Sequence, residues 1–255
     1  MNVSYLSLAG KVALVAGASR GIGKAIALAF SEAGAGVAIS GRKLPALEEA
    51  AKEIEKQTGG RVLPVEAHSR KSEDLRSLVE TVKSEFGRLD ILVNNAAANP
   101  VMAPLADIEE ATFDVIMDTN LKGYFILSQL AAKLMIQHGG GSILNISSVG
   151  GISPDKGLGV YCISKAAVNM LTRALALELG EHNIRVNALA LGVVQTRFSQ
   201  ALWSNEKLMA EEMRHTPLGR ISQPEEVARM ALAMVSDASA YMTGQIVVMD
   251  GGGSL

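Results

Sequence analysis

The strict alternation of short apolar runs with longer amphipathic segments is the feature that most constrains how this chain can fold. Apolar residues recur every three or four positions in residues 24–34, 44–57, 72–86, 112–137, 164–179 and 224–237, as in helices packed on one face. The runs between them are apolar at consecutive positions, which is typical of strands buried on both faces of a parallel sheet. These runs are residues 11–17, 36–40, 61–67, 89–95, 141–147, 184–191 and 244–250. We predict an α/β fold, a Rossmann-type doubly wound parallel sheet of about seven strands with helices on both faces.

No linker rich in Pro, Gly or Ser and no internal repeat interrupts this pattern, so we expect a single domain over residues 1–255. The longest stretch without a strand pattern, at about 193–223, carries apolar side chains such as Phe198, Trp203 and Met213. Apolar residues outside the sheet predict a substrate lid or pocket wall. The alternative is a surface excursion whose aromatic residues pack on the core or on a neighbouring subunit.

Composition excludes several classes of protein. The 255 residues carry a net charge of −2, which gives no reason to expect nucleic acid or an anionic membrane as a partner. Cys162 is the single cysteine, so an internal disulfide is excluded and a cytoplasmic location fits. The N-terminal residues do not resemble a signal peptide, and no apolar run is long enough to span a membrane. The four histidines are scattered, so we expect no metal site.

A glycine-rich loop follows the first predicted strand. Gly17, Gly21 and Gly23 stand between this strand and an amphipathic helix. In that position glycines allow a tight turn, close approach of the backbone to a pyrophosphate, and packing of the helix on the sheet. The alternative is a strand–helix turn without a ligand, but the placement favours dinucleotide binding.

The end of the second predicted strand indicates which dinucleotide binds. An NAD site usually has a carboxylate there, whereas this chain has Gly41 followed by Arg42. A guanidinium can bind a 2′-phosphate through two charge-assisted bonds, and Arg20 in the glycine loop could approach from the other side. We predict NADP(H) as the cofactor in preference to NAD(H). The alternative is that Arg20, Arg42 and Lys43 are solvated surface charges.

Tyr161 and Lys165 lie four residues apart, one turn along a predicted helix and on the same face. A free tyrosine has a pKa of about 10, and an ammonium at about 4–6 Å lowers the pKa of a neighbouring acid by roughly 1–3 units. We expect Tyr161 to act as a general acid in carbonyl reduction and as a general base in alcohol oxidation. The alternative for the pair taken alone is a tyrosine on the helix surface beside a lysine whose ammonium extends to solvent.

With these motifs placed, the chain resembles the classical short-chain dehydrogenase/reductase family over about residues 8–252. The matching segments are "AGASRGIG", "NNAA", "NLKG", "NISS" and "YCISK", in the order that the family has them. Within the family, other segments are similar to NADPH-dependent carbonyl reductase and to 3-oxoacyl-carrier-protein reductase-like members. The resemblance implies an NADP(H)-dependent oxidoreductase that transfers a hydride to or from a ketone, an aldehyde or a secondary alcohol.

The resemblance also implies roles for individual residues. The catalytic tetrad would be Asn120, Ser148, Tyr161 and Lys165, with Ser148 chosen over Ser147 because the family's serine lies 13 residues before the tyrosine. Ser148 would hydrogen-bond the oxyanion, and Asn120 would interrupt its helix and hold a water that links Lys165 to solvent. The implied cofactor-binding residues are Gly17, Ser19, Arg20, Gly21, Ile22, Gly23, Arg42, His68, Ser69, Asn94, Ala96, Tyr161, Lys165, Gly192, Val194 and Thr196.

Ala16, Ala97 and Leu191 depart from the family pattern, where threonine, glycine and proline are usual. These departures motivate an alternative of another class, a non-catalytic dinucleotide-binding subunit or scaffold. Apolar residues in segments 113–135 and 164–179 exceed what one buried helix face needs, which predicts a partner surface. The resemblance implies that this partner is the chain itself, in a homotetramer.

Overall fold

The sheet has the predicted architecture. The computed structural model describes residues 4–99 and 101–255, so the first three residues of the predicted domain and Pro100 lie outside the described residues. Seven parallel strands form one sheet in the order β3-β2-β1-β4-β5-β6-β7. They are β1 (Val12–Ala16), β2 (Gly36–Gly41), β3 (Val62–Glu66), β4 (Ile91–Asn94), β5 (Gly141–Ser148), β6 (Ile184–Leu191) and β7 (Ile246–Met249). Each coincides with one of the seven predicted runs, which confirms the doubly wound fold.

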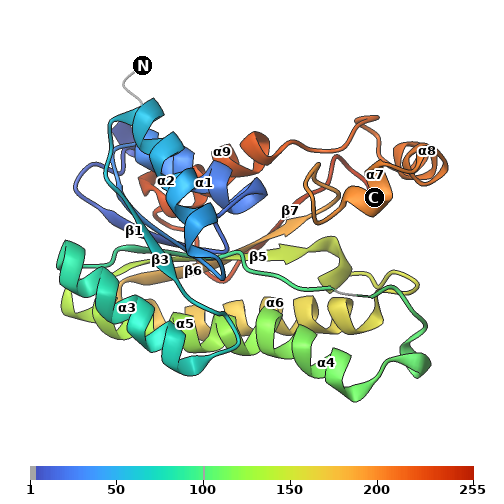
Figure 1. Ribbon diagram of the computed structural model, residues 1–255, viewed down its shortest axis with the longest axis horizontal. Coiled ribbons are helices and arrows are strands. Elements are labelled where there is room, and N and C mark those ends of the chain that lie inside the picture. Colours follow the sequence, from blue (N-terminus) through green and yellow to red (C-terminus); the bar gives the residue numbers. More distant parts are fainter. Residues whose placement is uncertain (1–3, 100) are drawn as a thin grey trace.

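Helices cover both faces of the sheet, as Figure 1 shows. One layer is α1 (Gly21–Glu32), α2 (Leu44–Thr58) and α9 (Pro224–Val235); the other is α3 (Ser72–Phe86), α5 (Gly123–Gln137) and α6 (Gly159–Leu179). Alternate residues of β1 supply the two cores: Ala13 and Val15 pack with the first layer, and Val12, Leu14 and Ala16 with the second. Because β1 is buried on both sides, it reads as an unbroken apolar run.

The strand order reverses beside β1, which pairs with β2 on one side and with β4 on the other. In open parallel sheets, ligands bind beyond the carboxyl ends of the strands at such a reversal. The glycine loop of residues 17–23 leaves β1 at this edge, and β4 and β5 end there too. The fold therefore gathers the predicted site residues at one edge of the sheet.

The predicted helix over 112–137 is continuous but changes its winding. α4 (Glu110–Met117) passes into a π-helical turn, η3 (Asp118–Lys122), before α5 begins. Asn120 lies in this turn, so the expected local interruption of its helix is confirmed. π-turns inside α-helices occur frequently at functional sites.

The stretch from 193 to 223 contains two short helices, α7 (Gln200–Trp203) and α8 (Glu206–His215). A single parallel bridge between Val194 and Ser222 joins the two ends of the stretch. In Figure 1 the two helices extend beyond the carboxyl edge of the sheet, on the side where α6 begins. This position suits a wall of a site at that edge.

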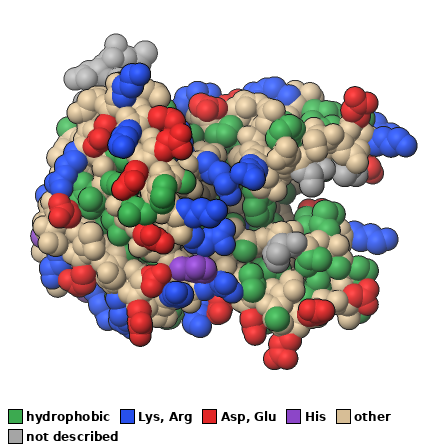
Figure 2. Space-filling model, in the orientation of Figure 1, with side chains coloured by type: hydrophobic (Ala, Val, Ile, Leu, Met, Phe, Trp, Pro, Cys, Tyr) green, Lys and Arg blue, Asp and Glu red, His purple; other side chains and the backbone are tan. Residues whose placement is uncertain are grey.

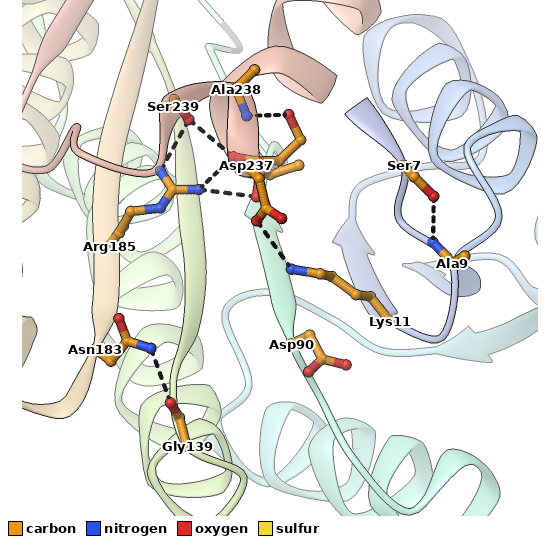
Figure 3. A network of polar contacts seen from close by, with 12 residues as sticks. Ser7, Ala9, Lys11, Asp90, Gly139, Asn183, Arg185, Asp237, Ala238 and Ser239 are labelled. Carbon is orange, nitrogen blue, oxygen red and sulfur yellow. Dashed lines mark hydrogen bonds and ion pairs between the residues drawn. The ribbon is translucent and has the colours of Figure 1, made fainter. Parts of the chain in front are cut away.

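The opposite, amino edge of the sheet is held by polar contacts (Figure 3). The Arg185 guanidinium, at the start of β6, donates to the carbonyl oxygens of Met234, Val235, Ser236 and Met242 and to the Ser239 hydroxyl, at 3.0–3.3 Å. Carbonyls in the last turn of a helix lack intrahelical partners, and a cation there also favours the helix dipole. Arg185 therefore fastens the end of α9 to β6.

Candidate active site

Tyr161 and Ser148 meet at the carboxyl edge of the sheet. Ser148 is the last residue of β5, and Tyr161 lies in the first turn of α6. The Ser148 side chain is hydrogen-bonded to the phenol, and its Oγ also accepts from the Gly150 backbone N–H at 3.1 Å. Both residues are half-buried.

The neighbouring serine has a different environment. Ser147 is buried, and its hydroxyl donates to Asn169 Oδ1 at 2.6 Å. Successive side chains of a strand point to opposite faces, so Ser147 and Ser148 cannot both face Tyr161. This geometry supports Ser148 as the serine of the site and gives Ser147 the role of joining β5 to α6.

Lys165 lies one helical turn after Tyr161 and is only 1% exposed. Its Nζ donates to the carbonyl oxygen of Ile146 at 2.8 Å and lies 5.7 Å from the centroid of the Tyr161 ring. A second ring, that of Tyr124 on α5, lies 5.2 Å from Nζ, and the Tyr124 hydroxyl donates to the same Ile146 carbonyl at 3.3 Å. The sequence analysis missed Tyr124, because nothing local shows that α5 turns this residue toward α6.

Burial dominates the acidity of both groups. It lowers the pKa of Lys165 from 10.5 to about 7. It raises the pKa of Tyr161 to about 12, although the hydrogen bond with Ser148 lowers it. The expectation that Lys165 lowers the pKa of Tyr161 is therefore wrong for the chain by itself. The reason is that an amine with a pKa of about 7 is neutral at the pH where this phenol ionises, and so has no charge with which to stabilise the phenolate.

Asn120 is fully buried and holds two segments together. Its Oδ1 accepts from the Ala98 N–H at 2.8 Å, while its Nδ2 donates to the Ala98 carbonyl and to Ser164 Oγ, both at 3.0 Å. Ser164 in turn donates to the Tyr161 carbonyl at 2.6 Å. Both N–H groups of the amide are thus in use, and Asn120 acts on Tyr161 through Ser164, a residue that the sequence analysis did not single out.

The glycine loop is shaped by close contacts that leave no room for side chains. Gly17 has φ +79°, and a Cβ on it would lie 2.8 Å from the Ala96 Cα. A Cβ on Gly23 would collide with the Gly17 carbonyl oxygen, which accepts from Asn95 Nδ2 at 2.7 Å. Such a cradle of bare backbone ahead of a helix fits a pyrophosphate. Asn95, which the sequence analysis passed over, holds it in shape.

Asn94 has a different place from the one predicted. Its side chain is 1% exposed, and its Nδ2 donates to Asn145 Oδ1 at 2.8 Å and to Ser128 Oγ at 3.0 Å. Asn94 therefore ties β4 to β5 and α5 beneath the crevice. Its predicted support of the cofactor can only be indirect, because no atom of it reaches the surface.

The residues predicted for the adenosine end lie at the ends of β2 and β3. Arg42 directly follows β2 and is exposed, and His68 follows β3, whose Glu66 pairs with Gly41. The pKa of His68 is lowered by burial first and then by the charges of Arg70, Arg42 and Lys71, with Asp74 opposing. Figure 2 shows Lys and Arg side chains gathered around a histidine on this face. A concentration of positive charge here suits a phosphate.

The remaining predicted cofactor residues surround the same crevice. Thr196 lies over the loop, with its Cγ2 3.5 Å from the position of a Cβ on Gly21. The Val194 carbonyl accepts from Ser199, which also lies 3.3 Å from the Thr196 hydroxyl. Gly192 packs against Asp250, and the Ser69 carbonyl packs against Gly123. Ser19, Arg20 and Ile22 lie in the glycine loop itself, between β1 and the first turn of α1.

Comparison with known proteins agrees with this geometry. A family model described as Enoyl-(Acyl carrier protein) reductase matches residues 17–254. The Thermotoga maritima 3-oxoacyl-(acyl-carrier-protein) reductase FabG is 40% identical over 97% of this chain and 99% of its own length. Dehydrogenase/reductase SDR family member 4 of Oryctolagus cuniculus is 39% identical over 96% and 94%. The chain belongs to the short-chain dehydrogenase/reductase family.

Solved structures of this family show the same fold. A 7α-hydroxysteroid dehydrogenase complexed with NADH and 7-oxo glycochenodeoxycholic acid superimposes with a TM-score of 0.94, at 36% identity over 99% of this chain and 97% of its own. A gluconate 5-dehydrogenase from Burkholderia cenocepacia J2315, in complex with NADP and tartrate, gives 0.95 at 30% identity over 100% and 99%. These short-chain dehydrogenases/reductases are oxidoreductases that bind nicotinamide dinucleotides and act on small molecules.

Neither a metal-binding group nor a membrane-spanning helix is found in the described residues. Among residues 4–99 and 101–255, no three His, Cys, Asp or Glu side chains are grouped so that they could hold a metal ion. No helix in the described part of the chain is long and apolar enough to cross a membrane.

Proposed function

We propose that the protein is an NADP(H)-dependent oxidoreductase that interconverts a ketone or aldehyde and a secondary alcohol, with Tyr161 as the general acid and base. The observation that carries this proposal is the contact of the Tyr161 and Ser148 hydroxyls beside the glycine loop, with Lys165 one turn away. Bound nicotinamide supplies or accepts the hydride. The chain's residues orient the substrate and move the proton.

In reduction, negative charge develops on the carbonyl oxygen as the hydride arrives. Ser148 donates a hydrogen bond to this oxygen, and Tyr161 gives it a proton. A phenol with a pKa of about 12 remains a stronger acid than the alcohol that forms, so reduction does not require a lowered pKa. In oxidation Tyr161 has to accept the proton as a phenolate, and the hydrogen bond with Ser148 is the contact in the chain that favours this form.

Cofactor preference is proposed from the basic groups beyond β2 and β3. Arg42 would bind a 2′-phosphate, and Gly41 leaves space where a carboxylate would repel it. A Cβ on Gly41 would meet only the Leu47 side chain, at 3.5 Å, so an aspartate fits there without strain. We expect Gly41→Asp to raise the KM for NADPH at least tenfold while the KM for NADH stays constant or falls. Equal effects on both cofactors would overturn the assignment of the 2′-phosphate to this place.

The activity is tested by a substrate panel of 3-oxoacyl thioesters, α-dicarbonyls, aryl ketones and sugars, run with NADPH and NADH side by side. We expect substrate-dependent loss of reduced cofactor, faster with NADPH. Binding of NADPH without reduction of any member of the panel would contradict the proposed activity. It would favour the alternative of a non-catalytic subunit or scaffold.

No contact in the described residues favours that alternative. Ala16, one of the departures from the family pattern, pairs in register with Ser40 and Asn94, and Leu191 pairs with Met249. Both lie in regular strands, so neither substitution disturbs the backbone at the edge of the site. Turnover of the substrate panel separates the two functions, because a dinucleotide-binding subunit would bind NADPH or NADH without reducing any substrate.

We propose a homotetramer from apolar side chains that the single chain leaves exposed. They lie on α5 and α6 and on β7 at the sheet edge: Phe125, Ile136, Ile163, Met170, Leu177 and Val248. A soluble monomer rarely exposes a contiguous apolar surface of this kind. Light scattering that gives a stable monomer would refute this assembly. A cytoplasmic location remains a prediction from the single cysteine.

A further inference from the structure

An aromatic side chain lies directly beside Tyr161. Phe198, in the stretch between β6 and α7, has its ring centroid 6.2 Å from that of Tyr161, with the rings tilted by 39°. Tilted rings at this separation attract one another, which holds Phe198 in place. Its side chain is nevertheless 57% exposed, so one face of the ring remains uncovered next to the reacting hydroxyl.

Two more exposed apolar side chains, Met102 and Leu105, lie on the segment after β4. The Ala103 N–H donates to the Gly157 carbonyl at 3.1 Å, which fixes this segment against the residues that lead into α6. Leu105 packs so closely on Gly159 that a Cβ there would lie 2.9 Å from its Cδ1. Met102 is 70% exposed and Leu105 is 54% exposed, although their segment contacts residues four and two positions before Tyr161.

Hydrophobic side chains thus stand on both sides of the approach to Tyr161. Figure 2 shows hydrophobic side chains on both sides of the hollow between the α7–α8 segment and the chain that leads to α4. Ile152, in the turn after Ser148, is another exposed apolar side chain. Exposed apolar side chains at a binding site stabilise the complex when an apolar substrate covers them.

The charges near this approach are of both signs. Glu212 on α8 has its pKa raised, by burial first and then by the negative charge of Asp155, with His215 opposing. Lys156 follows Asp155, and Arg197 precedes Phe198. The apolar side chains, and not the charges, therefore distinguish this side of the site.

We infer that the substrate carries its carbonyl on a neutral, apolar body, a ring or an alkyl chain, which covers Phe198 on one side and Met102 and Leu105 on the other. The inference rests on the proposed function and narrows it. A ketone with a carboxylate on its far side would set this charge against apolar side chains, which costs its hydration, so the site selects against it.

The test uses NADPH and three ketones that differ in one property each. Acetophenone has a neutral ring, 4-acetylbenzoate has the same ring with a carboxylate, and butanone lacks the ring. We expect kcat/KM for acetophenone to exceed that for 4-acetylbenzoate by about tenfold or more, because a carboxylate placed against apolar side chains loses its hydration.

Substitutions of Phe198 test whether the exposed apolar side chains cause the difference in kcat/KM between the ketones. Phe198→Ala should lower kcat/KM for acetophenone about tenfold and change that for butanone less than twofold, and Phe198→Leu should restore most of the loss. Tyr5→Ala removes a half-exposed aromatic side chain far from the site and should change neither value. Equal loss for both ketones in Phe198→Ala would show that Phe198 positions Tyr161 instead of binding substrate, and would overturn the inference.

Failure of the inference is distinguishable from failure of the proposed function. Reduction of 4-acetylbenzoate as fast as acetophenone, or reduction of anionic substrates alone, would leave an NADPH-dependent reductase whose substrate class is different. Reduction of no ketone at all, by protein that binds NADPH, would contradict the proposed function and this inference with it.

Discussion

Burial of Lys165 makes a prediction about folding that needs no substrate. Its pKa is about 7 in the folded chain and 10.5 in the reference state, so between these values the unfolded chain binds the extra proton. Stability rises with pH wherever the unfolded state binds more protons. The penalty for the buried ammonium is therefore complete below pH 7 and disappears as the pH approaches 10.5.

The magnitude follows from the two pKa values. Between pH 6 and pH 9, this lysine should add about 2–3 kcal/mol to the free energy of unfolding, at about 1.4 kcal/mol per pH unit of difference. Urea unfolding at pH 6, 7, 8 and 9 compares the wild type with Lys165→Met, which cannot titrate. The difference between the two proteins should change by this amount, and Lys133→Met, an exposed lysine on α5, should leave the pH dependence unchanged. A constant difference between wild type and Lys165→Met would refute the assigned burial.

Three more substitutions test individual contacts. Tyr124→Leu removes the ring 5.2 Å from Lys165 Nζ and should move the alkaline limb of the pH–rate profile about one unit lower, whereas Tyr124→Phe should not. Ser148→Ala should lower kcat about 10²–10³-fold with little change in stability. Ser147→Ala should leave kcat nearly unchanged and lower the free energy of unfolding in urea by about 1–2 kcal/mol. Arg185→Met leaves helix-end carbonyls without a donor and should cost about 3 kcal/mol in the same assay.

The sequence predicted most of the architecture because the signals for it are local. Each strand contains a short apolar run, and the main helices repeat their apolar residues every three to four positions. The choice of Ser148 over Ser147 came from spacing, and strand alternation gives it a physical reason. The glycine positions were also readable, since a turn between strand and helix restricts which residues fit.

The rest depends on contacts between distant segments, which no local pattern reveals. The pKa of Tyr161 was predicted in the wrong direction because the depth of burial around Lys165 is set by α5 and β5 together. Asn94 and Asn95 are neighbours in the sequence, yet one faces the sheet interior and the other the glycine loop. Tyr124 and Phe198 contact the site although each lies 37 residues from Tyr161 in the sequence.

The central claim is that the Tyr161 hydroxyl transfers the proton, and Tyr161→Phe tests it most directly because it removes one oxygen atom and keeps the ring. Single-turnover reduction of the best substrate should be measured with the cofactor already bound. The variant should still bind NADPH and unfold at a similar urea concentration, while its rate falls at least about 10³-fold, in the range expected for loss of a positioned acid. A variant that still reduces the substrate within tenfold of the wild-type rate would contradict this claim.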